Sequence, residues 1–184
     1  MVRRGWSTLA LVALLLGACG DDDDAPATST AVSGAAGPVA TLPADVAPGA
    51  GAMVLGDEQF DLDVVCTLDP STDAATGVTT ELAVDGGDQT GTVVSVTRQS
   101  TVGDVPTVTD TVAVEFGDTT LESQRVDAGG QLIDLRLPNA TERLIEVVAS
   151  DSGSLVRAQG VFGPAQSLAD DPANVEGSLI FRCP

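Results

Sequence analysis

The sequence has no histidine, no lysine and no tyrosine among its 184 residues. Histidine is the commonest general base and a common zinc ligand, while lysine forms Schiff bases and binds phosphate. A catalytic site would therefore have to use carboxylates, hydroxyls and arginine alone. The motifs G-x-S-x-G, H-E-x-x-H and the P-loop do not occur either. We expect a protein that is not an enzyme and that carries no metal or other cofactor.

Positive charge is scarce as well. All eight basic residues are arginine, and 27 Asp and Glu residues oppose them, for a formal charge of −19. Removal of the N-terminal signal, with its two arginines, would leave six and a charge of about −21. Nucleic acids and anionic lipid surfaces bind basic patches, because such patches release their counterions or satisfy phosphates. The composition therefore excludes nucleic acid as a partner.

Residues 1–18 have the features of a secretory signal. Arg3 and Arg4 precede an apolar run over residues 6–16, which is shorter than the roughly 20 apolar residues that span a bilayer. The run ends in Leu16-Gly17-Ala18-Cys19, which resembles the bacterial lipobox, and an ordinary cleaved signal is the alternative. We predict a lipoprotein signal peptide and a mature chain that acylated Cys19 anchors to the extracytoplasmic face of the cell membrane, where several acyl chains such as palmitate bind durably.

Residues 19–51 are predicted to form a disordered tether. Ala, Pro, Thr, Ser, Gly and Asp dominate this segment, so it cannot bury enough apolar surface to offset the entropy of ordering. The acidic run over residues 21–24 offers carboxylates to a metal ion, but consecutive like charges usually stay solvated and repel one another. We interpret the run as part of the tether.

Residues 52–184 are predicted to form one small all-β domain, since roughly 130 residues support a single core. Apolar and polar residues alternate along 60–67, 78–84 and 108–116. Gly, Asp and Pro punctuate these runs at 56–57, 85–88, 103–104, 117–118 and 128–130. This spacing is typical of an antiparallel β-sandwich or a partly open barrel.

The C-terminal third is more ambiguous. Asn139 is placed to cap a helix over 141–149, but the β-branched residues there favour a strand that forms a hairpin with 155–162. Residues 163–176 are predicted to form a loop, with one helical turn as an option. The last strand, 178–183, has Leu179, Phe181 and Cys183 on one face.

Two cysteines remain once Cys19 is assigned to lipid. Cys66 and Cys183 form an even pair in an exported chain, so the sequence predicts one disulfide that joins the first long strand to the last. Two free thiols acting as metal ligands are the alternative, but the sequence has no further Cys or His to complete such a site.

The remaining charged residues offer few candidate sites. Two acidic pairs, Asp61 with Asp63 and Asp85 with Asp88, are the candidates for carboxylate-based hydrolysis or for calcium binding. Alternating strand positions and a turn explain both pairs more simply. The arginines beyond the signal are scattered singly, so we expect surface ion pairs worth less than about 1 kcal/mol each: Arg98, Arg125, Arg136, Arg143, Arg157 and Arg182.

Five segments of the chain form a familiar combination: the lipobox, the Thr/Ala/Pro tether, the turn before Val65-Cys66-Thr67, the hairpin around Gly153-Ser154 to Gly160-Val161, and the final Gly177–Cys183 segment. In these segments the chain resembles the mycobacterial nineteen-kilodalton lipoprotein antigen family. The resemblance implies a noncatalytic actinobacterial envelope lipoprotein, displayed at the surface and sensed by host receptors through its acylated N-terminus. It also implies O-linked sugars on the tether, at Thr28, Thr30 and, less securely, Ser29.

Three functions follow as hypotheses. The first is a noncatalytic, surface-displayed interaction or antigen module whose partner is an envelope or host protein. The second is a carrier or sensor of an apolar ligand such as a lipid, because β-sandwiches and half-barrels can hold a cavity between their layers. The third is the carboxylate-based hydrolase, which has the weakest support in the sequence.

Overall fold

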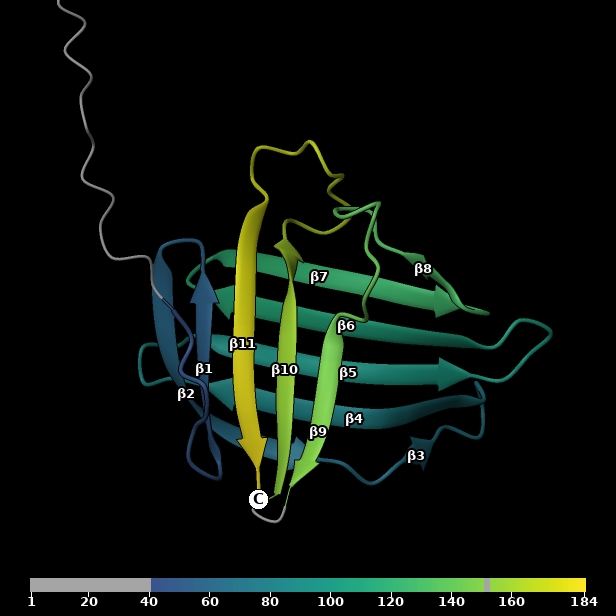
Figure 1. Cartoon of the computed structure of the whole chain (residues 1–184), viewed down its shortest axis with the longest axis horizontal. Helices are drawn as coiled ribbons and strands as arrows, with labels where there is room; N and C mark the ends of the chain where they lie inside the picture. Colours follow the sequence, from purple (N-terminus) through teal and green to yellow (C-terminus); the bar gives the residue numbers. More distant parts are fainter. Residues whose placement is uncertain (1–40, 151–152) are drawn as a thin grey trace, which may run out of the picture. The chain divides into compact units, whose positions relative to one another are not determined.

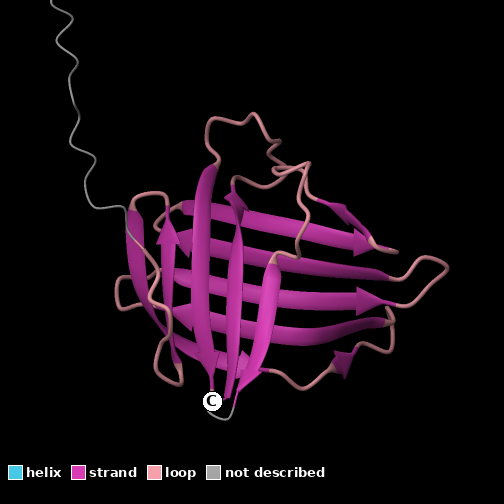
Figure 2. Cartoon of the chain, in the orientation of Figure 1, coloured by secondary structure: helices cyan, strands magenta, loops and turns pink. Residues whose placement is uncertain are grey.

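The computed structural model describes residues 41–150 and 153–184, which contain eleven β-strands and no α-helix (Figure 2). The strands are β1 (Ala50–Leu55), β2 (Glu58–Thr67), β3 (Ser71–Thr72), β4 (Val78–Gly87), β5 (Val93–Thr101), β6 (Thr107–Phe116), β7 (Thr119–Ala128), β8 (Gln131–Ile133), β9 (Ile145–Ser150), β10 (Gly153–Phe162) and β11 (Val175–Cys183). All strand pairs are antiparallel. The predicted all-β class is confirmed.

The strands form one curled sheet in the order β8-β7-β6-β5-β4-β2-β1-β11-β10-β9, and β3 pairs with β4. The long strand β2 makes the curl, because residues 58–63 pair with β1 while residues 63–67 pair with β4. In Figure 1, β1, β11, β10 and β9 form a front layer that runs across β4 to β7 in the back layer. Within the described residues β8 and β9 end the sheet without pairing to each other, so the fold is a half-barrel.

The core lies between the two layers. Period-two alternation places one side of each strand there, and the largest fully buried side chains come from both layers: Met53, Phe162, Leu179 and Phe181 from the front, and Val84, Val94, Val96, Val112 and Val114 from the back. Hydrophobic burial across this interface, at about 25 cal/mol per Å², is the main force that holds the layers together.

One glycine shows how closely the core side chains pack against the backbone of the front layer. A Cβ at Gly51 on β1 would overlap the ring of Phe181 on β11 and would lie 3.0 Å from Val64 Cγ2. The missing side chain therefore lets the buried Phe181 ring lie directly against the β1 backbone.

The C-terminal predictions agree with the structure in outline. The strand predicted over 141–149 is present as β9, which starts four residues later, at Ile145, and pairs with β10 as a hairpin. The predicted face of the last strand is also confirmed, since Leu179, Phe181 and Cys183 all enter the core. Strand β11 starts at Val175, earlier than predicted, because its first residues continue the pairing with the end of β10.

Two further predicted boundaries differ from the structure. The residues 85–87 were expected in a turn, but they lie in β4, where pairing with β2 on one side and β5 on the other overrides the turn preference of the two glycines. The domain was expected to start at Ala52, which lies inside β1. Residues 41–49 were expected in the tether. They lie instead on the outer face of the front layer, because Leu42 and Val46 pack against an apolar patch there.

Candidate functional site

A row of alternating charges crosses the inner face of the back layer. Arg98 on β5, Asp110 on β6 and Arg125 on β7 are in register, and Asp134 follows β8. Arg98 Nε donates to Asp110 Oδ1 at 2.7 Å and its Nη2 to Oδ2 at 3.0 Å. Arg125 Nε and Nη2 both donate to Asp134 Oδ2, at 3.0 and 2.9 Å. The charges balance in pairs, which allows them to be buried.

This row, which we call the charge row, holds the start of β9. Arg98 Nη2 donates to the Ile145 carbonyl at 2.6 Å, and the Ile145 N–H donates to Asp110 Oδ2 at 3.2 Å. Arg125 Nη1 donates to the carbonyl of Glu142 at 2.5 Å. Hydrogen bonds to Asp110 raise the pKa of Arg98 and outweigh the opposing effect of burial. At Ile145 the charged side chains thus take the place that a neighbouring strand would have.

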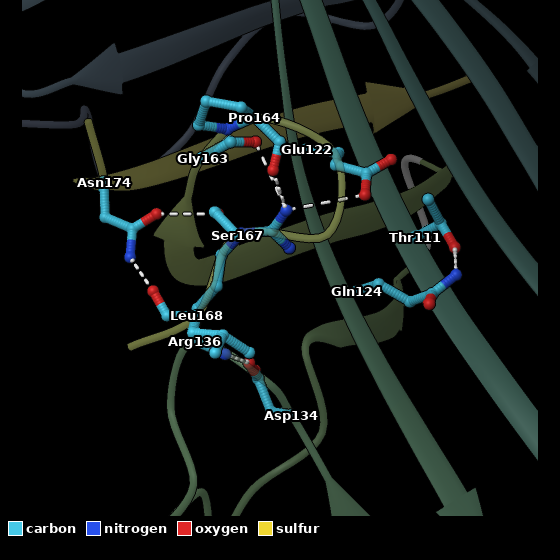
Figure 3. Close-up of polar contacts among 10 residues, drawn as sticks. All are labelled: Thr111, Glu122, Gln124, Asp134, Arg136, Gly163, Pro164, Ser167, Leu168 and Asn174. Carbon is cyan, nitrogen blue, oxygen red and sulfur yellow. Dashed lines mark hydrogen bonds and ion pairs between the residues drawn. The ribbon is translucent and has the colours of Figure 1, made fainter. Parts of the chain in front are cut away.

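A further buried arginine, Arg136, holds the loop between β10 and β11 (Figure 3). Its Nε donates to Ser167 Oγ at 2.7 Å, and its Nη2 donates to the Pro164 carbonyl at 2.6 Å. The Ser167 hydroxyl donates in turn to Asn174 Oδ1 at 2.9 Å. Backbone N–H of Arg136 donates to Asp134 Oδ1, so this cluster adjoins the charge row. The hydrogen bonds of the Arg136 guanidinium thus fix the conformation of the loop between β10 and β11.

Residues 41–49, which we call the strap, lie on the outer face of the front layer. Arg182 Nε donates to Asp45 Oδ1 and to the Val46 carbonyl, both at 3.0 Å, and Nη2 also bonds Asp45. The hydrogen bond from Arg182 lowers the pKa of Asp45. Arg157 Nη2 donates to the Ala44 carbonyl at 3.0 Å. Beneath the strap lie three buried outer-face side chains: Ala52, Leu155 and Ile180.

The prediction that every arginine makes a weak surface pair was wrong. Arg125, Arg136 and Arg182 are buried, and the Arg98 side chain is 14% exposed. Only Arg143 with Asp127 fits the expectation among the ion pairs of the described residues, with both side chains partly exposed. The alternation of residues could have indicated that members of the charge row are buried. Arg98 and Asp110 stand an even number of positions from valines that the pattern places on the core face of the same strands.

Two open clefts adjoin each other beside β10 and β11. The larger, of about 530 Å³, lies between these strands and the 137–143 segment. The smaller, of about 300 Å³, lies between them and the strap. No aromatic residue lines either cleft, and four residues line both: Glu142, Arg143, Gln159 and Ser178. The mainly polar lining of the larger cleft suits hydrogen bonding to an extended polar chain better than enclosure of an apolar molecule, whereas the lining of the smaller cleft is more apolar.

The acidic candidates lie apart from the charge row. Asp61, Asp63 and Asp88 line one open cleft of about 580 Å³, while Asp85 is exposed on the back layer. Asp88 caps the turn between β4 and β5, since its oxygens accept the N–H groups of Thr90 and Thr92, each at 2.8 Å. The Thr90 hydroxyl also donates to it, and these bonds lower the pKa of Asp88 to about 2. A local turn role accounts for this carboxylate.

In the described part of the chain, no three or more His, Cys, Asp and Glu residues are grouped so that they could hold a metal ion. The same part has no helix with the length and hydrophobicity needed to cross a bilayer.

The predicted disulfide is present. Cys66 on β2 and Cys183 on β11 are bonded, with their Cα atoms 5.6 Å apart and a separation of 117 residues in sequence. The other predicted modification residues, Cys19, Thr28, Ser29 and Thr30, lie outside the described residues, as does the predicted signal 1–18. The bond links the strand at the curl to the end of the chain.

The chain was compared with protein-family models, with curated proteins and with solved structures, and none of them matches it. A functional proposal therefore has to rest on the residues of this chain and on their geometry.

Proposed function

We propose that this protein is a noncatalytic cell-envelope lipoprotein, anchored through acylated Cys19 to the extracytoplasmic face of the membrane, where it displays its β domain as an interaction or antigen module. The observation that carries the proposal is the Leu16-Gly17-Ala18-Cys19 motif, which directly follows an apolar run. In this proposal the polar segment after Cys19 separates the domain from the bilayer.

The disulfide supports an exported location. Structural disulfides form and persist in oxidising compartments and are rare in the cytosol. Cys183 is fully buried, and it joins the end of the chain to β2 across the core. A stapled domain of this kind suits a protein that works outside the cytoplasm.

The use of charged side chains supports a noncatalytic role. The charge row binds backbone groups near β9, Arg136 binds a loop, and Asp88 caps a turn. Each of these polar groups already has a structural task. A catalytic acid or base instead needs free access to substrate and a pKa suited to proton transfer at the working pH.

The first test is the intact mass of the membrane-extracted full chain, measured before and after reduction. The expected species begins at acylated Cys19 and gains one pair of hydrogens when Cys66 and Cys183 are reduced. Hexose increments would assign sugar to the tether, with Thr28, Ser29 and Thr30 as the candidates. A Cys19→Ser variant should lose the acyl mass and leave the membrane fraction.

An unmodified Cys19 in wild-type protein would refute the anchored form of the proposal. Organic extraction of the same sample tests the competing role. A lipid that co-purifies reproducibly, in constant ratio to protein, would replace the interaction module by a carrier or sensor of apolar ligands.

A further inference from the structure

Strand β9 leaves one edge of the front layer open. It pairs with β10 on one side, and in the described residues no strand pairs with its other side. At Ile145 that open side is occupied, since Arg98 binds its carbonyl and Asp110 binds its N–H. Backbone groups alternate along an antiparallel strand, so Val147 and Ala149 face the same way as Ile145. Beyond the charge row, β9 therefore presents the N–H and C=O of both residues outward.

Within the described residues this edge has little of the usual protection against strand addition. Natural sheets protect their edges with charged side chains, especially lysine, and with proline, bulges or covering loops. Residues 145–150 contain no proline or lysine and one charged residue, Glu146, and the pairing of β9 with β10 is regular. The side chains of Val147 and Val148 are 40% and 42% exposed. Apart from Glu146, the edge is thus largely apolar, regular and of high β-propensity.

The back layer extends beyond β9, so one more front strand could pack against it. In Figure 1, β5 and β6 continue past β9 toward the 102–106 loop. Two residues beyond the charge row, Ser100 and Val108 are paired with each other on the same inner face, and both are half-buried. Residues two apart on a strand are about 7 Å apart, somewhat more than the 4.8 Å spacing of neighbouring strands, so the pair lies past the charge row by more than one strand width. An added front strand would cover this pair.

The negative charge of this protein favours one kind of added strand at the β9 edge. A second mature copy of this chain would bring another formal charge of about −21 against the first. An exposed carboxylate, Glu146, lies on β9 itself, paired across the sheet with the exposed Arg157 on β10. Long-range attraction instead favours an approaching segment that carries Lys or Arg.

We propose that β9 binds an extended basic segment of a partner protein, which adds a strand to the front layer through the outward backbone groups of Val147 and Ala149. Alternate side chains of the segment face Ser100 and Val108, where small or β-branched residues fit, and its basic side chains face solvent beside Glu146. This is recognition by strand addition. The inference rests on the proposed function, since it names the surface by which the interaction module works.

The test uses the full mature chain in micelles of a neutral detergent and a capped peptide of alternating Lys and Val. We expect the peptide to slow amide exchange at Val147 and Ala149 by at least about tenfold, as new hydrogen bonds protect these N–H groups. A Val147→Pro variant removes one outward donor, and it should weaken peptide binding by about tenfold. Val147→Thr keeps the donor, and it should bind within about twofold of wild type.

Exchange on the wild-type chain decides the question even if Val147→Pro does not fold. No protection at the two amides under saturating peptide, or protection elsewhere only, would overturn the proposal. Equal binding of a Glu/Val peptide would overturn its charge requirement. A dimer that protects both amides without peptide would show that a second copy is the occupant, against the proposal. These readouts do not depend on acylation, so failure of the anchor and failure of the edge site are distinguishable.

Discussion

Buried charges are tolerated here because each has its counterion in hydrogen-bonding distance. The Asp110 side chain is 4% exposed and accepts two bonds from Arg98 and one from a backbone N–H. Removing one member leaves the other charged and desolvated, which is far more unfavourable than losing an exposed pair. Individual side chains in the charge row should therefore be sensitive to substitution.

We expect Asp110→Ala to lower the free energy of unfolding by about 3–5 kcal/mol, since Arg98 would keep its charge without a partner. Arg143→Ala at the exposed pair with Asp127 is the matched control, with an expected loss below about 1 kcal/mol. Urea denaturation at neutral pH measures both. Equal losses in the two variants would contradict the assigned role of the charge row.

The carboxylate of Asp88 should titrate far below its ordinary value. The Thr90 hydroxyl is the largest cause of the lowered pKa, which lies at about 2 against 3.8. A carboxyl with a lowered folded pKa stabilises the fold above its unfolded pKa, and this contribution disappears as the pH falls from about 4 toward about 2. NMR titration of Thr90→Val should show a raised Asp88 pKa, whereas Thr119→Val should leave it unchanged.

At the scale of elements, arginine side chains bond backbone carbonyls at places where no neighbouring strand is present. The charge row binds the first residue of β9, and Arg182 binds the strap against the opposite face of the same layer. Both arrangements attach an irregular segment to a regular strand by charge-assisted bonds to backbone carbonyls, which are stronger than neutral ones. The two differ in exposure, since the strap residue Asp45 is exposed.

The strap should therefore be the less stable element. Asp45→Asn weakens its bond to Arg182, and we expect several-fold faster amide exchange at Gly49, whose N–H donates to the Arg182 carbonyl at 2.8 Å. The melting temperature should hardly change, because the strap covers only a small apolar patch. Asp57→Asn in the turn between β1 and β2 should leave the Gly49 exchange rate as it is. Unchanged exchange in Asp45→Asn would mean that packing of Leu42 and Val46 alone holds the strap.

For the whole molecule, the disulfide restrains the unfolded chain. It closes a loop over a separation of 117 residues, so that it spans β2 to β11 and most of the domain. Loop-closure entropy grows with loop length, so the longest loops give the largest effect in that model.

We expect the double variant Cys66→Ala and Cys183→Ala to be less stable than wild type by about 4–5 kcal/mol. Chemical denaturation of the oxidised wild-type protein and of the double variant measures the difference in their free energies of unfolding. Cys19→Ser, which leaves the bridge intact, is the control. A loss below about 1 kcal/mol would show that the unfolded chain is restrained by something other than the bridge.

Particular residues show how far the sequence reaches. Phe60, Leu62, Val64 and Cys66 follow one another at every second position, and the structure places all four on or against the core. The same rule carries Cys183 to the core face of β11, where it meets Cys66. It did not find the charge row, because an arginine at an inner position has meaning only once its counterion on another strand is known.

The sequence by itself determined the all-β class and the core faces of the strands, because alternation is a property of residues adjacent in the chain. It also determined the cysteine pair, because only Cys66 and Cys183 remain once Cys19 is assigned to lipid. Only the tertiary structure decided that β1 pairs with both β2 and β11, that Arg98 and Arg125 are buried, that the strap docks and that β9 ends the sheet. These features depend on strand order and register between segments far apart in the chain, and no local pattern encodes which strand is last.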